Sequence, residues 1–66
     1  MNEKYSLVGI DGNPFFILAY CCAAMRDEDC SSEEIEEYIK DAKSSDYNHL
    51  LSVSAEILKK LNDKNG

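Results

Sequence analysis

The hydrophobic and polar positions of the chain fall into four segments with different patterns. Residues 4–10 are rich in strand-forming side chains with some polar–apolar alternation, which predicts a short β-strand. Residues 14–26 are apolar almost throughout, residues 32–43 carry a narrow apolar stripe, and residues 47–62 carry a broad one. The pattern predicts a mainly α-helical chain in the order β-α-α-α, forming one small domain that spans all 66 residues. The polar tail 63–66 is expected to fray.

Local signals support a turn and a helix start after the expected strand. Asp11 and Gly12 form a dipeptide suited to positions that need a positive φ angle. Asn13 stands where a helix N-cap belongs, and Pro14 stands at the first helical position, where its missing N–H costs nothing. The first helix is therefore expected to begin at residue 14.

Two further start signals precede the other helices. Ser31 as an N-cap places Glu34 three residues later, which predicts a capping box. Asp46 ends the polar run before the third helix and is expected to cap it.

One short chain cannot pair the backbone of the expected strand or cover the whole apolar surface of the first helix. A lone strand leaves backbone N–H and C=O groups unpaired, and a helix that is apolar all round must be buried all round. A chain of this length buries only about 60% of its unfolded surface. The pattern therefore favours a homodimer in which the strands pair antiparallel across a two-fold axis and the first helix is covered. The alternative is a three-helix monomer with residues 4–10 as a loose extended arm.

The net charge of the chain indicates which kinds of macromolecule it can bind. The chain carries 13 acidic and 7 basic residues, for a net charge of −6. Nucleic-acid binding through phosphate neutralisation needs a basic face and is not expected. The acidic positions of the second predicted helix are candidates for binding a protein partner, or they form an ordinary solvated face: Glu33, Glu36, Glu37 and Asp41.

The cysteines indicate a reducing environment and no metal site. Their number is odd, and Cys21 and Cys22 are adjacent, which predicts free thiols and a cytoplasmic location. Together with Cys30 and His49 they lack the paired spacing of structural zinc sites, and no cofactor is expected. The apolar run 15–25 spans about 16 Å, so no membrane crossing is expected.

No catalytic residue is expected. His49 is the sole histidine, and a role in catalysis would need a nucleophile such as Cys21, Cys22 or Cys30 within reach. Because Cys21 and Cys22 lie in the most apolar stretch, their thiols are expected to be unreactive.

The loop before the first helix is a candidate ligand site. A helix N-terminus favours anions, although Pro14 removes one donor and Asp11 adds a negative charge. In a homodimer this loop and the start of the third helix would form a pocket for a small nucleotide-type ligand, through Asp11, Gly12, Asn13, Tyr47, Asn48 and His49. The alternative is that both segments form one internal network that locks the corner onto the third helix.

Two further motifs are G-x-DGN-x-F-x-IL, at residues 9–18, and DYNHLL, at residues 46–51. Together they resemble a family of small uncharacterised proteins of bacteriophages and prophages. Pro14, Phe16 and the adjacent cysteines depart from that pattern. The resemblance implies a non-enzymatic accessory protein that binds a protein partner and interferes with a host process. The alternative function is to sequester a small anionic nucleotide-type ligand.

Overall fold

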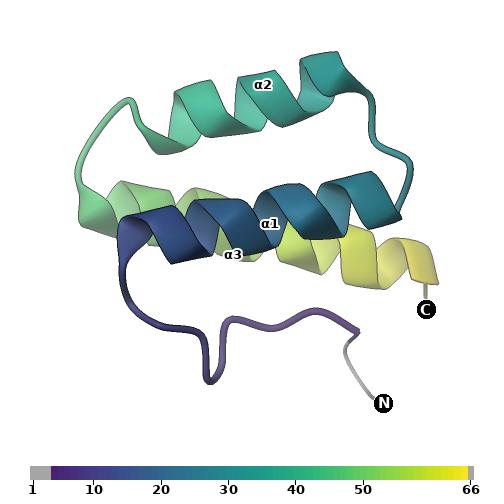
Figure 1. The fold of residues 1–66 in the computed structure, drawn as a ribbon, viewed down its shortest axis with the longest axis horizontal. Coiled ribbons are helices and arrows are strands. Elements are labelled where there is room, and N and C mark those ends of the chain that lie inside the picture. The colour runs from purple at the N-terminus through teal and green to yellow at the C-terminus, as the bar shows by residue number, and fades with distance from the viewer. Residues whose placement is uncertain (1–3, 66) are drawn as a thin grey trace.

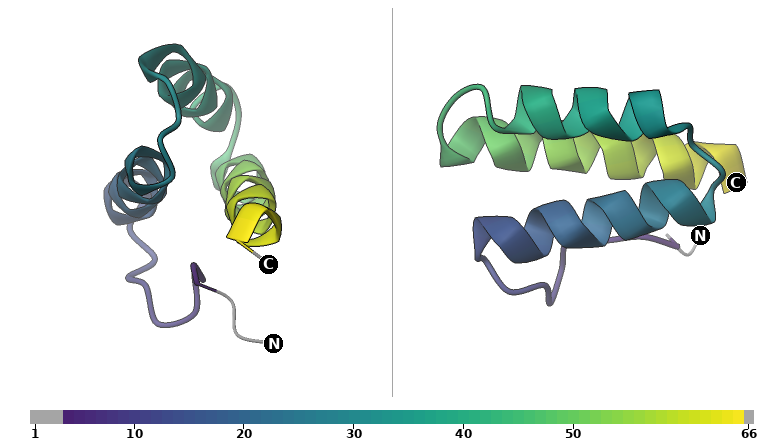
Figure 2. Two further views of the ribbon diagram at one scale, coloured as in Figure 1. Left: turned by 90° about the vertical axis from the view of Figure 1, so that its right-hand side faces the viewer. Right: turned by 45° about the horizontal axis from the view of Figure 1, so that its top comes forward.

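A computed structural model shows three helices and an N-terminal arm. The structure describes residues 4–65. The helices are α1 (Pro14–Asp27), α2 (Ser32–Ala42) and α3 (Tyr47–Asn65). They form a triangular bundle in end view, and the arm that precedes α1 runs along the side formed by α1 and α3 (Figures 1 and 2). The prediction of a mainly α-helical chain with three helices is confirmed, and residues 4–65 contain no strand.

The helices begin at the expected residues because each has its cap, and for α3 this is Asp46, whose Oδ1 accepts the His49 N–H at 3.0 Å. The Asn13 side chain accepts the Phe15 N–H at 2.9 Å, and Pro14 occupies the first position of α1. Ser31 and Glu34 form the capping box of α2 with reciprocal bonds of 3.1 and 3.0 Å.

Helix α1 is buried on one side only. The residues that face α2, α3 and the arm are Ile17, Leu18, Cys21, Ala24 and Met25. On the opposite side the Phe15 side chain is 74% exposed and that of Phe16 is 56% exposed, with Ala19 and Ala23 exposed between them and the end of the helix. Within a single chain α1 is thus not covered all round, because α2, α3 and the arm leave Phe15, Phe16, Ala19 and Ala23 exposed.

A small polar cluster joins the three helices inside the core. The Tyr38 hydroxyl of α2 and the Ser54 hydroxyl of α3 lie 2.7 Å apart, and both lie beside the Cys21 thiol of α1. Ser54 and Cys21 are fully buried. Because a buried hydroxyl is costly without a partner, this pair fixes how α2 and α3 face each other.

The arm is held by side chains instead of by a strand partner. The Tyr5 N–H donates to Asn62 Oδ1 at 2.9 Å, and Asn62 Nδ2 donates to the Tyr5 carbonyl at 2.9 Å. The Asn62 amide thus supplies the donor and acceptor that a neighbouring strand would have supplied. The Ser6 N–H donates to the Tyr20 hydroxyl at 3.0 Å.

A turn interrupts the segment where the strand was expected. The Ile10 N–H donates to the Leu7 carbonyl at 3.1 Å, and Gly9 has a φ angle of 84°. That geometry matches a type II turn, which needs glycine at its third position. In this segment the positive φ angle therefore falls at Gly9, and the prediction of one at Asp11 or Gly12 is wrong.

Helix α3 continues through the segment expected to fray. It extends to Asn65, while residue 66 lies outside the described part of the chain. Two of its last residues have partners elsewhere, since Asn62 binds Tyr5 and Lys64 Nζ donates to the Glu28 carbonyl at 3.2 Å. These contacts tie Asn62 and Lys64 to other parts of the chain, and fraying of the tail stays a prediction.

Among residues 4–65, no helix has the combination of length and apolar content needed to cross a bilayer.

Candidate functional site

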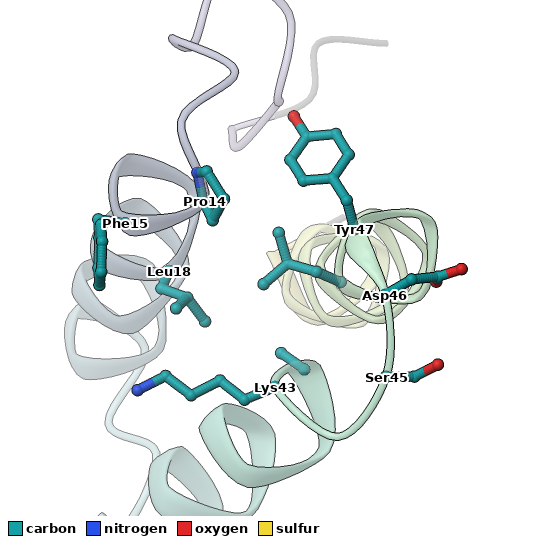
Figure 3. Close-up of a pocket in the computed structure, with 9 residues that line it drawn as sticks. Pro14, Phe15, Leu18, Lys43, Ser45, Asp46 and Tyr47 are labelled. Atoms are coloured by element: carbon teal, nitrogen blue, oxygen red, sulfur yellow. The ribbon is translucent and has the colours of Figure 1, made fainter.

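A hollow of about 290 Å³ lies at the end of the bundle where α1 begins and α2 ends (Figure 3). Its wall is mostly carbon and contains residues from all three helices and the α2–α3 loop. The residues that line it are Pro14, Phe15, Leu18, Ala42, Lys43, Ser45, Asp46, Tyr47 and Leu50.

The lining gives the hollow an apolar floor and one cationic edge. Leu18 points into the space between the helices, and the Lys43 side chain extends from the end of α2 toward α1 (Figure 3). Asp46 and Ser45 point away from that space (Figure 3). The arrangement suits a small apolar group that carries a negative charge at its exposed end.

The loop before α1 and the start of α3 do meet, through Tyr47. Its hydroxyl donates to the Gly12 carbonyl at 2.5 Å, and a Cβ atom at Gly12 would lie 3.3 Å from that hydroxyl. Asp11 Oδ1 accepts the Asn13 N–H at 2.9 Å, which closes the loop on itself. Four of the six candidate ligand residues are therefore engaged in one internal network: Asp11, Gly12, Asn13 and Tyr47.

The first turn of α1 has no spare backbone donor for an anion. Pro14 lacks an N–H, and the Phe15 N–H is bound by the Asn13 side chain. The N–H groups of Phe16 and Ile17 both reach the Asn13 carbonyl, at 3.0 and 3.2 Å. An anion at this end would have to displace those bonds, which removes the usual advantage of a helix N-terminus.

His49 and Asn48 do not belong to that loop. His49 Nε2 lies 3.0 Å from the Asp41 carbonyl and 3.2 Å from Asp41 Oδ1, with the Ser44 hydroxyl at 3.4 Å. The imidazole thus binds the C-terminal end of α2. Asn48 is exposed and makes no side-chain hydrogen bond with the described residues.

The acidic residues of α2 divide between a groove and open solvent. A groove of about 300 Å³ lies between α2 and α3. Its wall on α2 carries Glu37 and Asp41, with Glu34 at the first turn, and the remaining lining is Met25, Tyr38, Val53, Ile57 and Lys60. Glu36 lines a separate hollow near Arg26, and Glu33 lines neither.

The thiols are poor candidates for nucleophilic chemistry. Burial raises the pKa values of Cys21, Cys22 and Cys30. In the described part of the chain none of them is hydrogen-bonded to His49, and no three potential metal ligands come together.

A cluster around Tyr5 was not expected from the sequence. Its hydroxyl lies 2.7 Å from Asp27 Oδ2 and 2.6 Å from Glu28 Oε2, and Lys4 Nζ lies 3.1 Å from the same Glu28 oxygen. Desolvation and these carboxylates raise the pKa of Tyr5, and the hydrogen bond from Tyr5 lowers that of Asp27. More than twenty residues separate the partners, so no local pattern could have indicated the cluster.

Sequence reasoning also missed most of the apolar hollow. Phe15, Leu18 and Lys43 were assigned to helices without any expectation that they share a cavity. The one available indication was that exposed residues stand at the start of α1 and at the end of α2, where the hollow lies.

No protein-family model, curated protein or solved structure matches the chain. The resemblance to phage and prophage proteins therefore stays a prediction.

Proposed function

We propose that this protein is a non-catalytic binding module whose α2–α3 groove takes a segment of another protein. That segment would carry apolar side chains flanked by basic ones. The observation that carries the proposal is the composition of the groove, in which Glu37 and Asp41 stand beside the apolar side chains of Val53 and Ile57.

The two kinds of lining residue support different parts of the binding. Apolar side chains on the floor favour burial of Leu, Ile or Met from the partner, at roughly 25 cal/mol for each Å² removed from water. Three carboxylates line the groove against one lysine, Lys60, so its charge favours Lys or Arg of the partner. The net charge of −6 would raise the rate of encounter with a basic partner.

The phage resemblance supplies the proposed setting. A phage accessory protein of this kind would act in the host cytoplasm by occupying a basic surface of a host protein. This proposed function consists of binding alone and includes no catalytic step.

Fluorescence anisotropy tests the groove directly. The probe is a labelled helical peptide in which Leu residues form one face and Lys residues flank that face. Two variants remove the same amount of charge from α2. One carries Glu37→Gln and Asp41→Asn inside the groove, and the control carries Glu33→Gln and Glu36→Gln outside it. We expect the groove variant to weaken binding about tenfold, because two charged contacts are lost, and the control to weaken it much less.

An equal loss in both variants would show that only net charge matters, and would reject the groove as the binding surface. Absence of measurable peptide binding by the unaltered protein at low salt would reject it as well.

A small anionic ligand of the nucleotide type is the second candidate. The observation that favours it is the hollow beside Tyr47, since its volume of about 290 Å³ approaches that of small-ligand pockets and Lys43 offers a positive charge. A thermal-shift titration with cyclic and ADP-ribose-type nucleotides tests it. We expect any stabilisation to disappear in Lys43→Gln and to persist in Lys40→Gln, and no shift with any nucleotide would remove this candidate.

A further inference from the structure

The exposed side of α1 forms a continuous apolar stripe. Successive residues on this side are Phe15, Ala19 and Ala23, four positions apart, with Phe16 beside them. The two phenylalanines are 74% and 56% exposed, which is unusual for such large apolar side chains. The next residue in the same row, Asp27, is charged and exposed, and the exposed Arg26 stands beside it at the end of the stripe.

We infer that a second copy of this chain packs its α1 antiparallel on this stripe, with the two-fold axis passing next to Ala19. The interface goes beyond the proposed function and does not depend on it, because the stripe lies on α1 and the groove is lined mainly by α2 and α3.

The order of large and small side chains makes the stripe complementary to itself. When two copies run antiparallel about Ala19, Phe15 of each copy falls opposite Ala23 of the other. A large ring then meets a methyl group at both ends, and the small residue at the centre allows the helices to approach closely. A parallel pairing would place each phenylalanine against its own copy and leave the alanines facing a gap.

Charge favours the same direction of pairing. In a parallel dimer the two Arg26 side chains would lie side by side. In the antiparallel dimer Arg26 falls opposite Gly12 and Asp27 falls opposite Asp11 of the other copy, so each Arg26 stands next to carboxylates instead of next to a second Arg26. The helix dipoles are also opposed in that arrangement, which is the favourable orientation.

The arm is not required for this interface. The Tyr5 backbone is already bound to Asn62 of its own chain, so strand pairing between copies would have to break both bonds. Two helices of 14 residues meet over about 21 Å, which buries less than a standard interface. We therefore expect a reversible dimer that dissociates on dilution.

Sedimentation equilibrium over a hundredfold range of concentration tests the dimer. We expect Phe15→Ser to raise the dissociation constant about tenfold or more, because an anchoring aromatic ring is lost. Val8→Ser is the matched control, since Val8 is 91% exposed but lies in the arm. Equal weakening by both changes would indicate nonspecific association and overturn the inference, as would a monomer at every concentration.

Disulfide trapping tests the register. In a background with Cys22→Ser and Cys30→Ser, oxidised Ala19→Cys is expected to form an interchain disulfide in most molecules, because the two positions meet at the axis. Ala23→Cys is expected to remain unlinked, since its two copies stand about 12 Å apart along the helices, beyond disulfide reach. Glu33→Cys on α2 gives the background from random collisions.

Efficient linking at both Ala19→Cys and Ala23→Cys would show a parallel pairing and reject the proposed one. Linking at Ala19→Cys no greater than at Glu33→Cys would reject the interface altogether.

Discussion

Ser54 shows how one small polar side chain can control the packing of this bundle. It is fully buried, and its hydroxyl lies 2.7 Å from the Tyr38 hydroxyl on α2. Ser54→Ala removes that partner, so we expect a loss of about 1–3 kcal/mol in the free energy of unfolding, measured with urea. Ser52→Ala changes an exposed serine on the same helix and is expected to stay within about 0.5 kcal/mol.

The variants Ser54→Ala, Tyr38→Phe and the double variant together form a double-mutant cycle of free energies of unfolding. We expect the double variant to be less destabilised than the sum of the two single changes, because neither hydroxyl is then left buried without its partner. Simple additivity would mean that the two hydroxyls do not stabilise each other.

Neighbouring residues of the DYNHLL segment are expected to behave differently. His49 binds the end of α2 through the Asp41 carbonyl, whereas Asn48 is exposed without a side-chain partner among the described residues. We expect His49→Ala to lower stability by about 1 kcal/mol and Asn48→Ala to change it by less than about 0.5 kcal/mol. Thermal unfolding of both variants followed by circular dichroism is the measurement, and equal effects would contradict this assignment.

At the scale of elements, the helices were predictable because their start signals are local. Asn13, Ser31 and Pro14 each act within a few residues of the helix that they begin. The arm was not predictable in the same way, because its backbone pairs with Asn62 at the other end of the chain. A strand-like composition cannot distinguish a neighbouring strand from one side-chain amide that offers the same hydrogen bonds.

The candidate site was predictable in part for the same reason. The structure joins the two motifs through the hydrogen bond from Tyr47 to Gly12, and an internal network was one of the two expected outcomes. The separation of His49 from that loop depends on where α2 ends, which no short motif contains.

Asn62 offers a test of how the arm is held. We expect Asn62→Ala to speed amide hydrogen exchange at Tyr5 by about tenfold or more, because the Tyr5 N–H loses its acceptor, while exchange inside α2 changes little. Asp63→Ala alters the next, exposed residue and is the control. Unchanged protection at Tyr5 would show that the arm is held by its other contacts.

At the scale of the whole molecule, the free energy of unfolding is expected to fall at both high and low pH, and the buried Cys21 thiol and Tyr38 hydroxyl account for the alkaline side. Burial raises the pKa values of the Cys21 thiol and the Tyr38 hydroxyl above their ordinary values of 9.0 and 10.0. The unfolded chain therefore releases these protons first as pH rises, and the folded state loses stability. We expect the urea midpoint to fall above about pH 9.

The expected loss of stability at low pH comes from carboxyl groups whose pKa values are lowered in the folded state. Hydrogen bonds lower the pKa values of Asp27 and Glu34 below their ordinary values of 3.8 and 4.5. Stability from these groups is present above those values and is lost as pH falls further. A urea midpoint that rose between about pH 9 and about pH 10.5 would contradict the prediction for high pH. Tyr38→Phe removes one of the two buried groups and is expected to make the fall of the midpoint at high pH shallower.

The clasp between Tyr5 and Asn62 has a consequence for the order in which the molecule assembles. It joins positions 57 residues apart, so closing it early would cost the entropy of almost the entire chain for two hydrogen bonds. The three helices can collapse through shorter-range contacts first, and the arm then docks on a surface that already exists. Substitutions in the clasp should accordingly hasten unfolding and leave the refolding rate almost untouched, which would make Tyr5 a reporter of the last event on the pathway.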